Sequence, residues 1–181
     1  MEIVKTKIEG VLILKPTIHI DKRDFFSETY NKKRINLKKT IFVQDNISYN
    51  KKKFTFRGLH YQSKPFAQAK LIRVEKGEIL DFILDIRPNS KTYKKLITIK
   101  LSDKNLDQIF IPKGLAHGFL TLKDSTRVVY KVDRFYSKKH DKGYNIKDKF
   151  IKIKNSKKKF ILSNKDVNLP FFSDKIKDWI V

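Results

Sequence analysis

Two of the four histidines lie in sequence settings where an imidazole could transfer protons. His60 lies in FRGLHYQ, just after an expected glycine turn, and His117 lies between two glycines in IPKGLAHGF. A histidine titrates near physiological pH, which suits a general base or acid, although many histidines are only hydrogen-bonded structural groups. His19, in PTIHID, is expected to be structural or exposed, and His140, in SKKHDKG, is expected to be solvated.

Lys70 and Tyr130 are two further side chains whose expected positions matter for chemistry. Lys70 shares a strand face with Ile72, so its ammonium group points where apolar side chains point. A lysine in such a place needs an acidic partner or an anionic ligand. Tyr130 shares a face with Val128, and it is either a core aromatic with a hydrogen-bonded hydroxyl or a member of a site.

Short β-rich runs separated by glycines must position these side chains. Residues 70–75 and 78–87 alternate in polarity on either side of Gly77, which predicts a hairpin. Further strands are expected at residues 96–101, 109–112 and 127–132. Short strands spaced about ten residues apart predict an all-β sandwich or barrel.

Few segments have a helical pattern. Residues 24–37 are loosely amphipathic and predict a short N-terminal helix, and residues 164–171 predict a short turn that Pro170 ends. The lysine-rich residues 155–159 predict a charged surface turn. No repeat or shift in composition divides the chain, so we expect one domain over residues 1–181.

The composition excludes several classes of protein. Hydrophobic residues make up 40% of the chain and aromatic residues 12%, which can build a core and excludes a disordered chain. The absence of cysteine excludes disulfides, thiol nucleophiles and thiolate zinc sites. No apolar run approaches the roughly 18 residues of a membrane span, so no membrane partner is expected. The N-terminus lacks the apolar region of a secretory signal, and a cytoplasmic location is expected.

The formal net charge of +23 fits either a nucleic-acid-binding protein or a lysine-rich solvated surface. Only seven of the 42 basic residues are arginine, the side chain that best makes bidentate contacts to phosphate and guanine. The lysines are also scattered along the whole chain. These observations favour the lysine-rich surface and no nucleic-acid partner, although the charge should attract small anions.

The two histidine segments are similar to the two motifs of a cupin barrel. A metal-binding cupin has a His-x-His pair in its first motif, whereas this chain has His60 followed by Gln62. His60 and His117 alone are too few ligands for a metal site. The residues therefore favour a site without a metal, in which His60 is a base.

Longer motifs extend this resemblance to a family. The segments FRGLHYQ, QAKLIRVEKGEILDFILDIRPNSKTY, IFIPKGLAHGF, VVYKVDRFYSKKHDKG and ILSNKD occur in this order. Together with VLILKPTIHIDKRDFFSETYN and FVQDN, they resemble the nucleotide-sugar 3,5-epimerases typified by dTDP-4-dehydrorhamnose 3,5-epimerase. The resemblance covers about residues 10–175. It implies a cofactor-free, cupin-type jelly roll that acts as a homodimer and converts dTDP-4-dehydro-6-deoxy-D-glucose into dTDP-4-dehydro-L-rhamnose, the precursor of dTDP-L-rhamnose.

The resemblance also implies roles for individual residues. It makes His60 the catalytic base, Asp166 the acid that orients it, Tyr130 the proton donor on the opposite sugar face, and Lys70 the cation near the enolate oxygen. Tyr136 matches an aromatic residue that packs against the nucleobase. The positions expected to line the nucleotide-sugar site are Arg23, Phe26, Glu28, Gln44, Asn46, Arg57, His117, Tyr136, Asp141 and Lys165.

The chemistry of the sugar agrees with these roles. The protons at C3 and C5 are acidic because both carbons flank the C4 ketone, and the resulting enolate needs a cation or hydrogen-bond donors at its oxygen. Inversion then needs a second acid on the opposite face. The chain departs from the family at Leu115, where phenylalanine is frequent, at Val167, where arginine is frequent, and in KNSKKKF, which replaces a tryptophan-proline segment.

Three alternatives remain open from the sequence. An epimerase that inverts only C3 would need nearly the same residues. A sugar-binding cupin without activity and a basic nucleic-acid-binding barrel are the alternatives from other classes, and the joint presence of His60, Lys70, Tyr130 and Asp166 argues against both.

Overall fold

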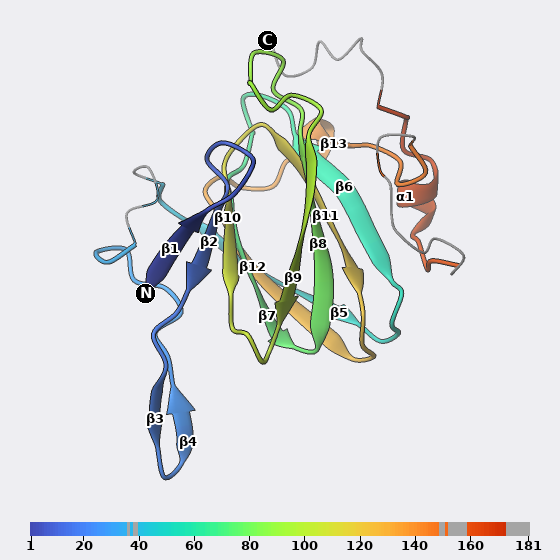
Figure 1. Cartoon of the computed structure of the whole chain (residues 1–181). Helices are drawn as coiled ribbons and strands as arrows, with labels where there is room; N and C mark the ends of the chain where they lie inside the picture. The colour runs from blue at the N-terminus through green and yellow to red at the C-terminus, as the bar shows by residue number, and fades with distance from the viewer. Residues whose placement is uncertain (36, 38–39, 149–150, 152–158, 173–181) are drawn as a thin grey trace.

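Two antiparallel sheets face each other across a hydrophobic core in this computed structural model, which describes residues 1–35, 37, 40–148, 151 and 159–172 (Figure 1). The larger sheet has the order β1 (Glu2–Lys5), β2 (Leu12–Lys15), β10 (Gln108–Ile111), β7 (Lys70–Lys76), β12 (Thr126–Val132) and β5 (Gln44–Asn50). The smaller sheet has the order β13 (Asp141–Gly143), β6 (Phe56–Gln62), β11 (Leu115–Thr121), β8 (Glu78–Asp85) and β9 (Leu96–Ser102).

The central core fills the space between these sheets. Ile72 and Val128 contribute to it from the larger sheet, and Ile83 and Phe119 from the smaller one. A second cluster, which includes Phe82, covers the other side of the smaller sheet with residues from the C-terminal part of the chain. This arrangement confirms the expected all-β, cupin-type jelly roll.

The expected hairpin about Gly77 is wrong. All five predicted strands are present, but β7 and β8 lie in different sheets, and β7 pairs with β10 and β12. Gly77 carries the chain from one sheet to the other with φ +89°, a conformation that favours glycine. A Cβ atom on Gly77 would lie 2.4 Å from Oγ1 of Thr126, so the tight passage also leaves no room for a side chain.

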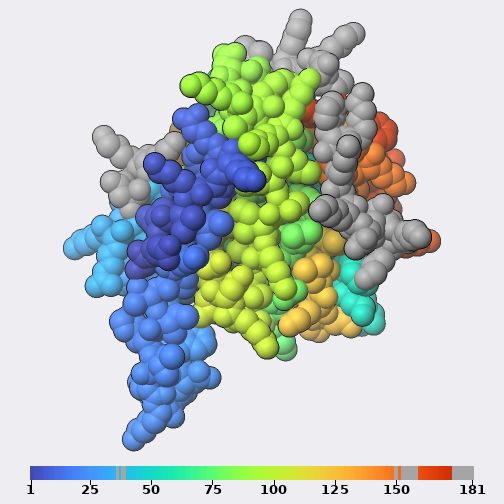
Figure 2. Space-filling model, viewed as in Figure 1, coloured from blue at the N-terminus to red at the C-terminus, as the bar shows by residue number. Residues whose placement is uncertain are grey.

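The expected N-terminal helix is also wrong, because Asp24 has φ 111° and turns the chain back on itself. Strands β3 (His19–Asp21) and β4 (Asp24–Phe26) instead form a hairpin that projects from the two sheets (Figures 1 and 2). Phe25 and Phe26 are exposed on this hairpin and do not pack into the core. The described residues from 27 to 37 contain no helix.

The expected C-terminal turn is confirmed as α1 (Asn164–Val167), where the Ser163 hydroxyl accepts a hydrogen bond from the Asp166 N–H and caps the helix. A 3₁₀ turn, η1 (Lys138–His140), precedes β13. Most of the expected surface turn at 155–159 lies outside the described residues. Within the described part of the chain, no helix has the length and apolar character needed to cross a membrane.

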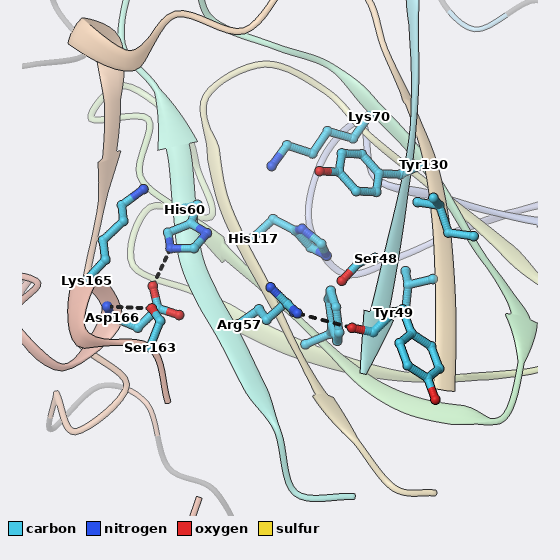
Figure 3. Close-up of a pocket in the computed structure, with 13 residues that line it drawn as sticks. Ser48, Tyr49, Arg57, His60, Lys70, His117, Tyr130, Ser163, Lys165 and Asp166 are labelled. Carbon is cyan, nitrogen blue, oxygen red and sulfur yellow. Dashed lines mark hydrogen bonds and ion pairs between the residues drawn. The ribbon is translucent and has the colours of Figure 1, made fainter. Parts of the chain in front are cut away.

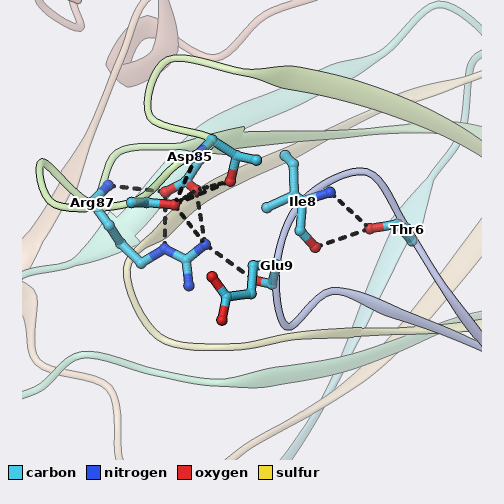
Figure 4. Close-up of polar contacts among 7 residues, drawn as sticks. Thr6, Ile8, Glu9, Asp85 and Arg87 are labelled. Atoms are coloured by element: carbon cyan, nitrogen blue, oxygen red, sulfur yellow. Dashed lines mark hydrogen bonds and ion pairs between the residues drawn. The ribbon is translucent and has the colours of Figure 1, made fainter.

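A buried carboxylate organises the loop after β8 (Figure 4). Asp85 is fully buried and accepts hydrogen bonds from Nε and Nη2 of Arg87 and from the hydroxyls of Ser90 and Thr92. Arg87 also donates to the backbone carbonyl of Glu9, which ties this loop to the loop between β1 and β2. One acidic side chain therefore holds two loops at the same end of the jelly roll.

Asp85→Ala is expected to lower the free energy of unfolding by about 2–4 kcal/mol, because it leaves several buried donors and the Arg87 guanidinium without their acceptor. Chemical denaturation monitored by circular dichroism measures this loss. Asp21→Ala is the matched control, since Asp21 pairs with Arg23 at the same spacing on the exposed hairpin and its loss should change little. Equal effects of the two substitutions would contradict the role given to burial.

Candidate active site

A pocket of about 460 Å³ opens between the two sheets (Figure 3). Strands β5, β7 and β12 of the larger sheet form one wall, and strands β6 and β11 of the smaller sheet form the other, with the α1 segment at the edge. Its lining residues are Ile47, Ser48, Tyr49, Arg57, His60, Lys70, His117, Phe119, Val128, Tyr130, Ser163, Lys165 and Asp166. All four predicted catalytic residues therefore lie in one pocket.

Close approach of two strands brings the two candidate histidines together. The glycine turn expected just before His60 is wrong, because Gly58 lies within β6 and Gly118 lies within β11. His60 is the register partner of His117 on these two strands. Gly58 has φ +125°, and a Cβ atom on it would lie 2.6 Å from Cα of Gly118. The glycines thus set the separation of the strands that carry the histidines.

His60 is held by a carboxylate from the far end of the chain. Its Nε2 lies 2.6 Å from Oδ1 of Asp166, which is buried at the start of α1. Burial acts to raise the pKa of Asp166. Hydrogen bonds with the side chains of His60 and Ser163 and with the backbone of Gly58 outweigh this effect and hold the pKa below its usual value. Because the neutral His60 ring donates from Nε2, its Nδ1 is left as the basic nitrogen.

Lys70 and Tyr130 reach the pocket from the opposite sheet (Figure 3). Burial lowers the pKa of Lys70 to about 8, while the charges of Asp141 and Asp81 act to raise it. Burial also raises the pKa of Tyr130, so its hydroxyl keeps its proton at neutral pH. The pocket thus places a cation and a protonated hydroxyl across from His60.

A second histidine–carboxylate pair lies in the same wall as His60. Nε2 of His117 lies 2.8 Å from Oδ2 of Asp81, and both side chains are buried. Burial lowers the pKa of His117, so this ring is neutral at neutral pH. Sequence reasoning missed Asp81, although an acid that alternates with Ile79 and Ile83 on an inward strand face was the available signal.

Five predicted binding residues form a hydrogen-bonded group, and one of them, Lys165, also lines the pocket. The backbone N–H of Tyr136 donates to Oε1 of Gln44 at 3.2 Å, and Nε2 of Gln44 donates to Oδ1 of Asn46 at 2.8 Å. The Tyr136 hydroxyl and the Lys165 ammonium group both donate to Oδ2 of Asp141. This group extends the polar surface of the pocket beyond its lining residues.

Three of the predicted binding residues, Arg23, Phe26 and Glu28, neither line the pocket of this chain nor belong to that hydrogen-bonded group. Arg23 lies on the projecting hairpin, where it pairs with Asp21, and Phe26 is 67% exposed on the same hairpin. Glu28 accepts a hydrogen bond from Asn31 and does not reach the pocket lining. The lining residues that the sequence did not indicate are Ile47, Ser48, Tyr49, Phe119, Val128 and Ser163.

The other two histidines differ in environment. His19 is exposed on β3, as expected. His140 is not simply solvated, because its ring packs on Phe66 at 4.5 Å between centroids and its Nδ1 lies 2.8 Å from Oγ of Ser137. Among the residues that the structure describes, no cluster of three or more His, Asp or Glu side chains could hold a metal ion.

A jelly roll with a carboxylate-paired histidine on one wall and a cationic lysine and a protonated tyrosine on the other contains the groups that a proton-transferring isomerase of the cupin class needs. The sequence matches the family described as dTDP-4-dehydrorhamnose 3,5-epimerase over residues 5–174. The match spans nearly the whole chain. The chain belongs to the dTDP-4-dehydrorhamnose 3,5-epimerase family.

Relatives and solved structures agree with this assignment. A dTDP-4-dehydrorhamnose 3,5-epimerase from Shigella flexneri is 43% identical over 96% of this chain and 97% of its own length. The Bacillus anthracis enzyme of the same name, solved with TDP and PPi bound, is 43% identical with a TM-score of 0.91, over 94% of this chain and 99% of its own. A Legionella pneumophila epimerase in complex with dTDP-4-keto-L-rhamnose is 36% identical with a TM-score of 0.88, over 94% of this chain and 92% of its own.

Lys70→Met is expected to raise the thermal unfolding midpoint by a few degrees at pH 7. Burial lowers the pKa of Lys70 from 10.5 to about 8, so the folded state holds this proton less tightly than the unfolded chain. Below pH 8, Lys70 is protonated in both the folded and the unfolded state, and burial of its charge lowers the free energy of unfolding by the full amount. This destabilisation decreases as the pH rises from 8 to 10.5, because the folded state loses the proton first. Calorimetry at pH 7 and pH 10 should therefore show a larger gain at pH 7, and a destabilised variant at pH 7 would contradict this account.

Proposed function

We propose that the chain converts dTDP-4-dehydro-6-deoxy-D-glucose into dTDP-4-dehydro-L-rhamnose by inverting C3 and C5. The observation that carries this proposal is the His60–Asp166 pair at 2.6 Å, which faces Lys70 and Tyr130 across the pocket. The complex of the Legionella pneumophila relative, which contains dTDP-4-keto-L-rhamnose, supports the same sugar.

In the first step, Nδ1 of His60 takes the proton from C3. The electron pair of the C3–H bond forms a C3=C4 double bond, and the C4 carbonyl becomes an enolate oxygen. The Asp166 carboxylate stabilises the imidazolium that results, and the Lys70 ammonium group donates a hydrogen bond to the enolate oxygen. The negative charge of Asp166 is thus opposite to the positive charge that develops on His60, and the positive charge of Lys70 is opposite to the negative charge that develops on the enolate oxygen.

In the second step, the Tyr130 hydroxyl gives a proton to the opposite face of C3, and the C4 carbonyl forms again. Tyr130 suits this role because burial keeps its pKa high and its hydroxyl protonated. Proton exchange with solvent then restores His60 and Tyr130, and the same groups repeat the sequence at C5. No bound metal or cofactor takes part in this scheme.

Cationic side chains next to the base bind the diphosphate of the nucleotide. Arg57 lines the pocket, where Nε donates to Oδ1 of Asn50 and Nη2 to the carbonyl of Tyr49, so its guanidinium plane is fixed. Lys165 adds a second positive charge. Tyr136 donates a hydrogen bond to Asp141, but its side chain is more than half exposed. Its ring therefore offers an aromatic face to the nucleobase.

The active form is a homodimer in which the β3–β4 hairpin of one protomer completes the pocket of its partner. The hairpin exposes Ile20 to 83% and Phe26 to 67%, which is costly in water unless another surface covers them. In this arrangement Arg23, Phe26 and Glu28 bind substrate across the interface. We place this single-domain enzyme in the cytoplasm, without a nucleic-acid partner.

Incubation of the enzyme with substrate in deuterated water should place label at both C3 and C5, as detected by NMR. His60→Asn should lower both inversion and exchange by about 10²- to 10⁴-fold, because no enolate forms without the base. Tyr130→Phe keeps His60, Asp166 and Lys70, so exchange should continue with retention while inverted product falls more steeply.

Label at C3 alone would favour an epimerase that acts on one carbon, and no label would favour a sugar-binding protein. A silent Tyr130→Phe variant would mean that the ring only packs the pocket. Equal loss of exchange and inversion in that variant, with an unchanged circular dichroism spectrum, would place the tyrosine in enolate formation.

Subunit mixing tests the shared pocket. The homodimers of Arg23→Ala and of His60→Asn should each be weakly active, for different reasons. Mixed dimers contain one pocket with both native residues, so an equimolar mixture after subunit exchange should regain about a quarter of the native activity. Activity that stays at the mean of the two variants would show that Arg23 acts within its own chain or not at all.

A further inference from the structure

Asp81 is a buried acid beside the pocket whose role the reaction scheme leaves open. It lies in the middle of β8, with its side chain on the inward face between Ile79 and Ile83. It is fully buried, and its Oδ2 accepts a hydrogen bond from Nε2 of His117 at 2.8 Å. Its Oδ1 has no hydrogen-bond partner among the described residues.

A carboxylate in this position is costly unless positive charge compensates it. Burial raises the pKa of Asp81, whereas the hydrogen bond from His117 and the charge of Lys70 act to lower it. Hydrophobic side chains such as Ile83 and Phe119 surround the same part of the core. The structure therefore retains an acid where an apolar residue would pack at lower cost.

The charge of Lys70 depends on groups from several elements. Asp141 on β13 and Asp81 on β8 favour its charged form, and Lys165 on α1 disfavours it. The neutral groups beside it in the pocket include His117 and Tyr130. Asp141 also holds Lys165 and Tyr136 by direct hydrogen bonds, whereas the Asp81 charge lies inside the core.

We propose that Asp81 is a positioning residue of the active site, which fixes the His117 ring through Nε2 and supplies the buried negative charge that keeps the Lys70 side chain as a cation. The hydrogen bond to Asp81 leaves Nδ1 of His117 as the acceptor of the neutral ring, which suits a sugar hydroxyl. The inference rests on the proposed function, since Lys70 acts there as the cation at the enolate oxygen.

The first experiment measures Lys70 directly and needs no substrate. In protein labelled with ¹³C at the lysine ε-carbons, NMR should show one lysine that titrates near pH 8, apart from the surface lysines, and Lys70→Arg assigns it. In Asp81→Asn, which preserves shape and removes charge, this titration should move to lower pH. Glu75→Gln removes the same charge from an exposed position on the strand of Lys70 and should leave the titration unchanged.

The second experiment measures the pH profile of kcat/KM. In Asp81→Asn, the pH at which kcat/KM falls on the alkaline side of the profile should be lower than in the native enzyme. A shift of this alkaline limb by about one pH unit lowers kcat/KM about tenfold at a given pH on that limb. A purely structural role would lower activity evenly at all pH values. An unmoved Lys70 titration in the folded variant would overturn the proposal, because it would mean that Asp81 is already neutral in the native enzyme.

The reciprocal variant keeps the proposal testable if Asp81→Asn does not fold. Lys70→Met removes a positive charge near His117, so the imidazole of His117 should protonate at higher pH. The chain has only four histidines, so NMR can follow each ring. An unchanged His117 titration would show that the three groups are not coupled. Failure of substrate turnover alone, with both titrations as expected, would instead count against the proposed reaction.

Discussion

The hydrogen bond between His60 and Asp166 is the contact on which the geometry of the site depends, and it joins residues 106 positions apart in the sequence. His60 is fixed by its place in β6, but Asp166 lies in a four-residue helix that has little stability of its own. The chain around that helix is held from both sides. Ile161 forms a bridge to Thr55 next to β6, and Nδ2 of Asn145 donates to the carbonyl of Val167. The packing of the C-terminal segment therefore determines where the carboxylate meets the base.

The buried charged side chains at the pocket lower the stability of the fold. Aliphatic side chains at the positions of Lys70 and Asp81 would stabilise the fold more. Burial lowers the pKa of Lys70 and raises the pKa of Asp81. In the proposed reaction this cost has a function, because the enolate and the imidazolium need opposite charges that are fixed before the reaction starts. The larger sheet supplies the lysine and the tyrosine, and the smaller sheet supplies both histidines. Each wall of the pocket thus presents a different kind of group.

Alternation in the sequence was enough to predict five strands and the inward direction of Lys70 and Tyr130, because polarity reports which face of a strand is buried. It could not predict pairing partners. The residues around Gly77 look like a hairpin, but the chain changes sheets there, and only tertiary packing decides between the two. The turn expected at Gly58 is wrong for the same reason, since in sequence a glycine that permits close strand approach resembles a glycine in a turn. The roles proposed for Arg23 and Phe26 rest on the family resemblance, since neither residue reaches the pocket within one chain.

The central claim is that Asp166 fixes the tautomer of His60 and leaves Nδ1 free to act as the base. Nitrogen-15 NMR of the imidazole rings at a pH where His60 is neutral measures this most directly, with His60→Asn to assign the signals. The account predicts a proton on Nε2 and none on Nδ1, and a loss of this preference in Asp166→Ala. A neutral ring with its proton on Nδ1 in the native enzyme would contradict the account, because no basic nitrogen would then face the substrate.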